Sequence, residues 1–145
     1  MIKERHVCAL KYAKELKKLG YPQDDSLWYW IVDLQTQKEH LYGKVGREVY
    51  NHQIDYEIYA APTVAELGEV LPDEIKWDNN KAFLTFDSRR CLSYKVVCLG
   101  NRTQYSGRSI WEETVVNKNA DTEANTRAKM YIYLIKNKHI KVEDL

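Results

Sequence analysis

Cysteine, phenylalanine and long apolar runs are all scarce in this sequence, and each absence narrows what the protein can be. The three cysteines include no C-x-x-C pair, so we expect free thiols in a reducing cytoplasm rather than a disulfide framework. No stretch of about 18 apolar residues occurs, which argues against a membrane-spanning helix. The charged N-terminus has no apolar run behind it, so we expect no signal peptide and a cytoplasmic protein without a membrane partner.

Motifs for catalysis and metal binding are missing as well. The histidines form no H-x-x-x-H or H-E-x-x-H pair, and only His40 and His52 are worth comparing with a metal pair. The segment 43–46 has the G-x-x-G outline of a nucleic-acid clamp, but we interpret it as a mobile turn, because no helix pair flanks it. No nucleophile elbow or phosphate-binding glycine loop occurs. We therefore assign no catalytic residue, no metal and no cofactor.

Charge is nearly balanced in number but not in position. The sequence has 22 Lys and Arg against 21 Asp and Glu, a net charge of +1. Residues 1–87 hold 11 basic and 15 acidic side chains, a net charge of −4, whereas residues 88–145 hold 11 and 6, a net charge of +5. A basic C-terminal half favours an acidic partner, and a solvated surface is the simpler alternative.

Aromatic residues are abundant, but of particular kinds. Eleven Tyr and four Trp stand against only two Phe. Tyr and Trp combine an apolar ring with a polar tip, which suits half-buried sheet faces and interaction surfaces alike.

The clearest helix is predicted over residues 121–138. One stripe at helical spacing is apolar, and its two alanines allow a close approach to a sheet. The members of this stripe are Ala124, Ala128, Tyr131 and Ile135. The opposite side carries Thr126, Lys129, Tyr133 and Lys136. Asp121 or Asn119 is the expected N-cap.

The N-terminal half predicts a helix over residues 3–19, ended by Gly20, and a strand over residues 27–32. That strand is apolar at consecutive positions, which predicts that both of its faces are covered. Residues 35–53 are mostly polar and only Leu41-Tyr42 suggests a short strand.

The middle of the chain predicts strands and one short helix. Residues 54–59 alternate, with Ile54 expected to face the core. Thr63 and Glu66 then form a capping box, which starts a short helix. Three further strands, at 74–77, 82–86 and 91–99, are predicted to form a meander, and 109–116 favours another strand. The roles of residues 35–53 and 100–119 stay open.

These elements predict a single α+β domain over residues 1–145. We expect an antiparallel, meander-rich sheet packed against the N-terminal and C-terminal helices, with the Thr63 helix as a short third helix.

Two segments resemble a known group of proteins. They are Ala61-Pro62-Thr63-x-x-Glu66-Leu67-x-x-x-Leu71-Pro72 and Glu123-Ala124-Asn125-x-Arg127-Ala128-Lys129-x-x-Ile132-Tyr133-Leu134-Ile135. Both look like small uncharacterised proteins of phages and of prophage or mobile regions in bacterial genomes, and residues 16–30 fit the same pattern. The resemblance implies a cytoplasmic, single-domain accessory protein. It brings no activity and no functional residue.

Three hypotheses on function follow. The first is a non-catalytic protein that binds a protein partner or forms a homodimer, with Tyr133 on the outward side of the closing helix as a contact. The alternative is nucleic-acid binding by the basic half, with Arg89, Arg90, Arg102 and Arg108 on phosphates. The second alternative is an enzyme without a recognised motif, which requires a deep pocket with converging polar groups.

Overall fold

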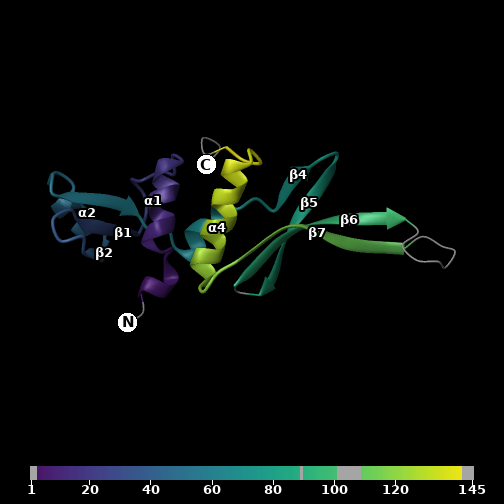
Figure 1. The fold of residues 1–145 in the computed structure, drawn as a ribbon, viewed down its shortest axis with the longest axis horizontal. Coiled ribbons are helices and arrows are strands. Elements are labelled where there is room, and N and C mark those ends of the chain that lie inside the picture. The colour runs from purple at the N-terminus through teal and green to yellow at the C-terminus, as the bar shows by residue number, and fades with distance from the viewer. Residues whose placement is uncertain (1–2, 89, 101–108, 142–145) are drawn as a thin grey trace.

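The computed structural model describes residues 3–88, 90–100 and 109–141, which form two antiparallel sheets with helices between them (Figure 1). The three-stranded sheet has the order β2-β1-β3, and the four-stranded sheet is a meander with the order β4-β5-β6-β7. The elements in chain order are η1 (Lys3–His6), α1 (Leu10–Lys18), β1 (Trp28–Asp33), β2 (Glu39–Gly43), α2 (Lys44–Tyr50), β3 (Tyr56–Ala60), α3 (Val64–Val70), β4 (Glu74–Trp77), β5 (Asn80–Ser88), β6 (Cys91–Gly100), β7 (Ser109–Asn119) and α4 (Glu123–Lys136).

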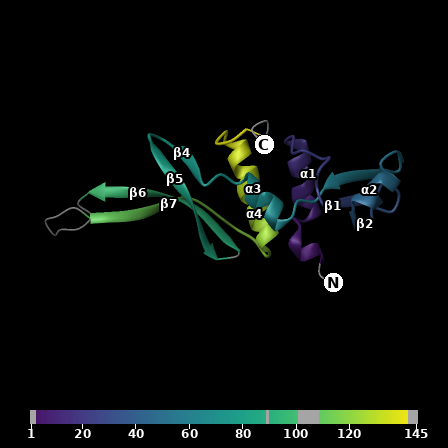
Figure 2. The ribbon, with the colours of Figure 1, turned by 180° about the vertical axis from the view of Figure 1, so that it is seen from behind.

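The molecule is a single α+β domain, as predicted, but its strands divide into two sheets rather than one. The sheets lie at opposite ends, and α1, α3 and α4 fill the space between them (Figures 1 and 2). One apolar core connects the two ends, because Trp30 of the first sheet and Tyr94 of the second belong to the same buried cluster. Among the described residues, no helix has the length and apolar character needed to cross a membrane.

The predicted closing helix is present as α4. Ala124, Ala128 and Tyr131 are fully buried, which confirms the apolar stripe. The N-cap is Thr122, whose hydroxyl accepts from the Asn125 amide at 3.1 Å, rather than Asp121 or Asn119.

The outward side of α4 is less exposed than the sequence indicated. Thr126 is fully buried, which corrects the prediction. The reason is that Arg90, directly before β6, packs over the first turn of α4. The Thr126 hydroxyl lies 3.2 Å from the Arg90 carbonyl oxygen, which also accepts from the Ala120 amide at 3.3 Å.

The predicted N-terminal helix is broken in two. Residues 7–9 are extended, because long-range hydrogen bonds hold them: the Cys8 amide donates to the Pro62 carbonyl at 3.1 Å, and the Ala9 amide to Asn125 Oδ1 at 2.7 Å. The predicted end at Gly20 is confirmed. Gly20 has φ 99°, and the Tyr21 amide donates to the Leu16 carbonyl at 2.9 Å, the closure typical of a glycine-ended helix.

Two predictions for residues 43–54 are wrong. The expected mobile turn at 43–46 is the beginning of α2, which lies close against β2: a Cβ atom on Gly46 would stand 2.6 Å from Tyr42 Cβ. Ile54 is 92% exposed instead of facing the core, because β3 begins only at Tyr56.

The remaining local predictions are confirmed. The Thr63 hydroxyl accepts from the Glu66 amide at 3.1 Å, and the Glu66 carboxylate accepts from the Thr63 amide at 3.3 Å, so the capping box begins α3. Residues 109–116 form a strand, as part of β7. β6 and β7 are longer than predicted and project from the body as a hairpin (Figure 1).

Candidate functional site

Two of the residues predicted from the sequence to bind a partner, Arg90 and Tyr133, lie within the described parts of the chain. Arg89, Arg102 and Arg108 lie outside the described residues. Arg90 is exposed at the start of the turn into β6, and its backbone carbonyl contacts the first turn of α4.

Tyr133 lies near the other end of α4. Its ring stacks on His139, with ring centroids 6.1 Å apart, and Lys118 Nζ lies 4.5 Å from its centroid. His139 in turn stacks on Trp77 at 5.3 Å. Seven residues of helix, about 10 Å, separate Tyr133 from Thr126, which contacts Arg90. The structure therefore places Tyr133 in a half-buried aromatic stack and does not bring it together with Arg90.

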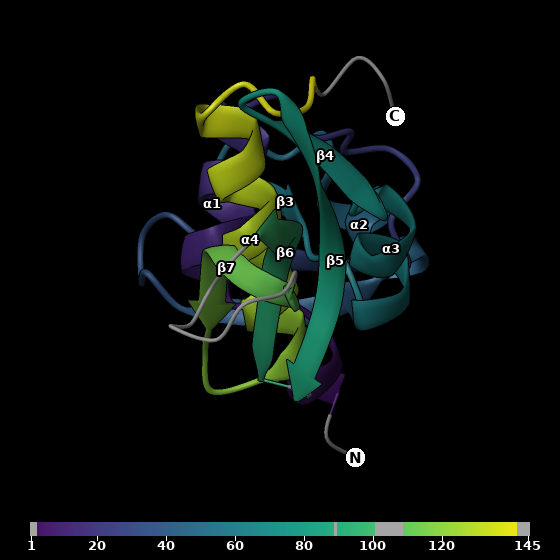
Figure 3. The ribbon, with the colours of Figure 1, turned by 90° about the vertical axis from the view of Figure 1, so that its right-hand side faces the viewer.

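Among the described residues, helix α4 covers one face of the four-stranded sheet and no helix covers the other. Leu92 and Tyr94 point inward, toward α4, which lies behind β6 and β7 in the end-on view (Figure 3). The side chains of the opposite face, here called the outer face, alternate with them on β5 and β6. They include Phe83, Thr85, Ser93, Lys95 and Val97.

A polar cluster lies on the outer face around Asp87. Its Oδ2 accepts from the Ser93 hydroxyl at 2.5 Å, and its Oδ1 from Lys95 Nζ at 2.9 Å. Asn117 Nδ2 donates to Ser93 Oγ at 2.8 Å and lies 3.1 Å from Cys91 Sγ. The hydrogen bonds from Ser93 and Lys95 lower the pKa of Asp87, and the bond to Asp87 raises the pKa of Lys95.

The geometry of this cluster is that of cross-strand pairing rather than catalysis. Ser93 is fully buried, and its hydroxyl is already donated to Asp87. A nucleophilic hydroxyl needs space for a substrate beside it, and the full burial of Ser93 leaves none. The sequence did not point to Asp87, because β5 extends two residues beyond the predicted strand 82–86.

Apolar side chains lie beside this cluster on the outer face. Phe83 is 45% exposed and Val97 is 52% exposed. Phe83 pairs with Lys95, so Val97 is its diagonal neighbour across β5 and β6, a spacing that lets large side chains share one contact surface.

The three-stranded sheet is organised differently, because α2 lies across one of its faces. The Arg47 guanidinium lies 5.0 Å from the centroid of the Tyr29 ring and forms a 2.9 Å ion pair with Asp24. Tyr29 is fully buried, and burial raises its pKa. The helix is short, so it leaves a hollow on each side, and Tyr56 lines both.

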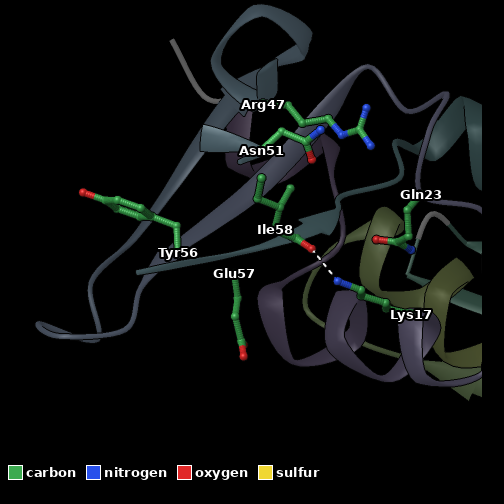
Figure 4. Close-up of a pocket in the computed structure, with 7 residues that line it drawn as sticks. All are labelled: Lys17, Gln23, Arg47, Asn51, Tyr56, Glu57 and Ile58. Carbon is green, nitrogen blue, oxygen red and sulfur yellow. Dashed lines mark hydrogen bonds between the residues drawn. The ribbon is translucent and has the colours of Figure 1, made fainter. Parts of the chain in front are cut away.

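The first of these, the β3-edge hollow, has a volume of about 280 Å³ (Figure 4). It lies between α1, α2 and β3. It is lined by Lys17, Gln23, Arg47, Asn51, Tyr56, Glu57 and Ile58. Lys17 Nζ donates to the Ile58 carbonyl at 2.9 Å, while Arg47 and Asn51 project from α2 on the other side of Ile58 (Figure 4).

The second, the tyrosine hollow, has a volume of about 230 Å³ and is walled by stacked rings. The ring centroids of Tyr42 and Tyr50 are 5.5 Å apart, and those of Tyr50 and Tyr56 are 4.7 Å apart. A hydrogen bond with Tyr50 raises the pKa of Tyr42. Sequence patterns do not predict this hollow, because its tyrosines come from three separate elements.

The structure gives no support to a metal pair of His40 and His52. His40 lines the tyrosine hollow, while His52 is exposed and lines neither hollow. Within the described parts of the chain, no group of three His, Cys, Asp or Glu side chains is arranged to hold a metal ion. Cys8 is buried, which raises its pKa to about 12 and keeps it a thiol.

The fold and its surfaces define the class to which this chain belongs: a small α+β protein with two antiparallel sheets, one of them a meander. Comparison with protein-family models, curated proteins and solved structures gives no match.

Proposed function

We propose that this chain is a non-catalytic accessory protein of the phage or mobile-element type, which acts in the cytoplasm by binding another protein. The contact surface is the outer face of the four-stranded sheet. The observation that carries the proposal is the exposure of Phe83 and Val97 as neighbours on that face. Large exposed apolar side chains that lie together are typical of interaction sites.

The partner is placed on the face of the sheet rather than on its edge. β7 is an edge strand, and its described residues pair with β6 alone. However, a bulge at Val115 and the exposed charges of Glu112 and Glu113 protect this edge, since bulges and charges discourage the pairing of another strand. If the partner is a second copy of this chain, the two outer faces meet around a twofold axis and form a homodimer.

The test compares two valines of similar exposure at opposite ends of the molecule. Val97 is 52% exposed on the outer face and Val49 is 59% exposed on α2. A photo-crosslinking amino acid is placed at either position, and the adducts formed in a bacterial lysate are separated by mass. We expect a discrete adduct from position 97 only, and expect Phe83→Ser to abolish it.

Two results would reject the proposal. One is equal labelling from positions 97 and 49, and the other is an adduct that persists unchanged with Phe83→Ser. Sedimentation of the unlabelled protein distinguishes a homodimer from a complex with another protein. A homodimer sediments with twice the mass of the chain, and Phe83→Ser should return it to the mass of a monomer.

Nucleic-acid binding by the basic half is the alternative, and exposed Arg90 is the observation in its favour. Nearby cations are engaged elsewhere, since Arg127 lies over the Phe86 ring at 5.0 Å and Lys118 over Tyr133. A gel shift at low salt tests it: binding to phosphates weakens steeply as salt is raised, and Arg90→Ala weakens it further. An enzyme is the second alternative, and the two hollows beside α2 are candidate substrate sites for it.

A further inference from the structure

We propose that the β3-edge hollow is a binding site for a small molecule that carries a carboxylate or phosphate group. This site lies at the opposite end of the molecule from the outer face and is independent of the protein-binding function. Three features support it: the donors around the hollow, the occupied edge of β3, and the position of the nearest acidic side chains.

The donors come from two parts of the chain and line the hollow on both sides of Ile58 (Figure 4). Arg47 lies on α2, Asn51 is the C-cap residue one turn further along, and Lys17 reaches the hollow from α1 (Figure 4). Arg47 uses Nη2 for Asp24 and Lys17 uses one bond for the Ile58 carbonyl. A guanidinium has five N–H donors and an ammonium has three, so both have further donors for a ligand. A guanidinium beside an amide and an ammonium suits an oxyanion.

Side chains already bond the free backbone groups along the edge of β3, so the ligand is a small molecule rather than an added peptide strand. The Leu34 amide donates to the Asp55 carbonyl and the Ala61 amide to the Trp28 carbonyl. In an antiparallel pair the bonding alternates, so residues 56, 58 and 60 point their backbone groups away from β1. Lys17 occupies the Ile58 carbonyl, and Gln23 Oε1 accepts from the Ala60 amide at 2.8 Å. These two side chains block an added peptide strand.

Of the acidic side chains near the hollow, Glu57 lines it but points away from two of the three donors. Glu57 projects from the other side of β3, away from Arg47 and Asn51 (Figure 4), and accepts a hydrogen bond from the Tyr59 hydroxyl. That bond, together with burial, raises the pKa of Tyr59 to about 12. Asp24 is 86% exposed and contacts one edge of Arg47. At about 280 Å³ the hollow has the volume of about nine water molecules. It is near the lower limit for ligand pockets, so a small acid or a phosphate fits.

The first test places the same charge inside and outside the hollow. Asn51→Asp puts a carboxylate among the donors, and His52→Asp puts one on the next residue, which does not line the hollow. The probes are inorganic phosphate and succinate, titrated at constant ionic strength and followed by the NMR signals of the Ile58 and Asn51 amides. We expect saturable shifts in the unmodified chain, affinity weakened about tenfold or more by Asn51→Asp, and little change with His52→Asp.

A second pair separates the site from general charge. Arg47→Gln and Lys44→Gln each remove one positive charge from α2, but only Arg47 lines the hollow. Only Arg47→Gln is expected to abolish binding. Saturation with succinate alone assigns the site to carboxylates, and saturation with phosphate alone assigns it to phosphates. No saturable shift with either probe, or equal loss in the two members of each pair, overturns the proposal.

Discussion

The two sheets differ in how many of their faces are covered, and the strand sequences reflect the difference. β1 is apolar at consecutive positions, because Tyr29 lies under α2 while Trp30, on the opposite face, donates to the Cys8 carbonyl at 2.9 Å. Residues 92–96 of β6 alternate instead, with Tyr94 buried against the core and Lys95 on the outer face. Periodicity in a central strand therefore reports the number of layers around its sheet.

Because a helix covers a face of one sheet and not the outer face of the other, the two ends of the molecule suit different kinds of ligand. A seven-residue helix across a sheet leaves hollows at its sides, which suit small molecules. A bare sheet face with neighbouring apolar side chains is broad and flat, which suits a protein surface. The two proposed functions therefore occupy opposite ends of one molecule, and the comparison can be tested by asking how independent those ends are.

The largest effect is expected from Leu134→Ala in α4, between the two sheets. Leu134 is fully buried, and truncation of such a leucine costs about 2–5 kcal/mol of unfolding free energy. Because one core joins both ends, hydrogen exchange should speed up together for amides of β1 and β6.

The control for Leu134→Ala is Val49→Ala, which removes apolar atoms that are already 59% exposed and should change stability by less than about 0.5 kcal/mol. If β1 amides keep their protection in Leu134→Ala while β6 amides lose it, the sheets unfold separately, and the single-core description is wrong.

A smaller and more local effect is expected from two helical glycines. A Cβ on Gly46 would lie 2.6 Å from Tyr42 Cβ and 2.8 Å from Tyr42 Cγ, atoms close to the backbone of β2. Gly46→Ala should therefore cost roughly 1–3 kcal/mol, with faster hydrogen exchange concentrated in α2 and β2.

Gly68→Ala in α3 is the matched variant. There the added Cβ meets only Arg127 Nη1 at 2.9 Å, the far end of a flexible side chain. Alanine is the better helix former by about 1 kcal/mol, so this variant should be neutral or stabilising. Equal destabilisation by both substitutions would show that α2 is not held against β2 as closely as the structure indicates.

The sequence predicts elements that carry their own local signal. The capping box at Thr63 and the apolar stripe of α4 depend on residues three or four apart, and both are confirmed. α2 has only one apolar pair at helical spacing, Val45 and Val49, and it is too short to show a longer apolar period. The break before α1 was equally hidden, because its cause is Asn125, 116 residues away.

The candidate sites were harder to predict than the fold. The β3-edge hollow depends on the placement of α2, and the cluster around Asp87 depends on strand register, neither of which periodicity specifies. The candidate arginines were chosen from the basic half of the chain, and only Arg90 of them is described. This choice missed Arg47, which lines the hollow but lies in the more acidic half.

The smallest effect is expected from Asp87→Asn on the outer face. The folded state lowers the pKa of Asp87 through its bonds from Ser93 and Lys95. A lowered pKa stabilises the folded chain above the unfolded value of about 3.9, and this stabilisation is lost as the pH falls through the folded value. The side chain is 32% exposed, so the cost at pH 7 is expected to be about 1 kcal/mol or less.

The measurement for Asp87→Asn is the urea midpoint of both proteins at pH 7, 5 and 3. The difference between them should be constant from pH 7 to about 5 and shrink below about pH 4. Asp25→Asn, in an exposed loop before β1, should match the unmodified chain within about 0.5 kcal/mol at pH 7. No difference between Asp87→Asn and the unmodified chain at pH 7 would mean that the outer face does not favour the ionised form of this carboxylate. The open face would then be ordered by its backbone pairing alone, in contrast to the covered sheet, where side chains of α1 and α2 complete the structure.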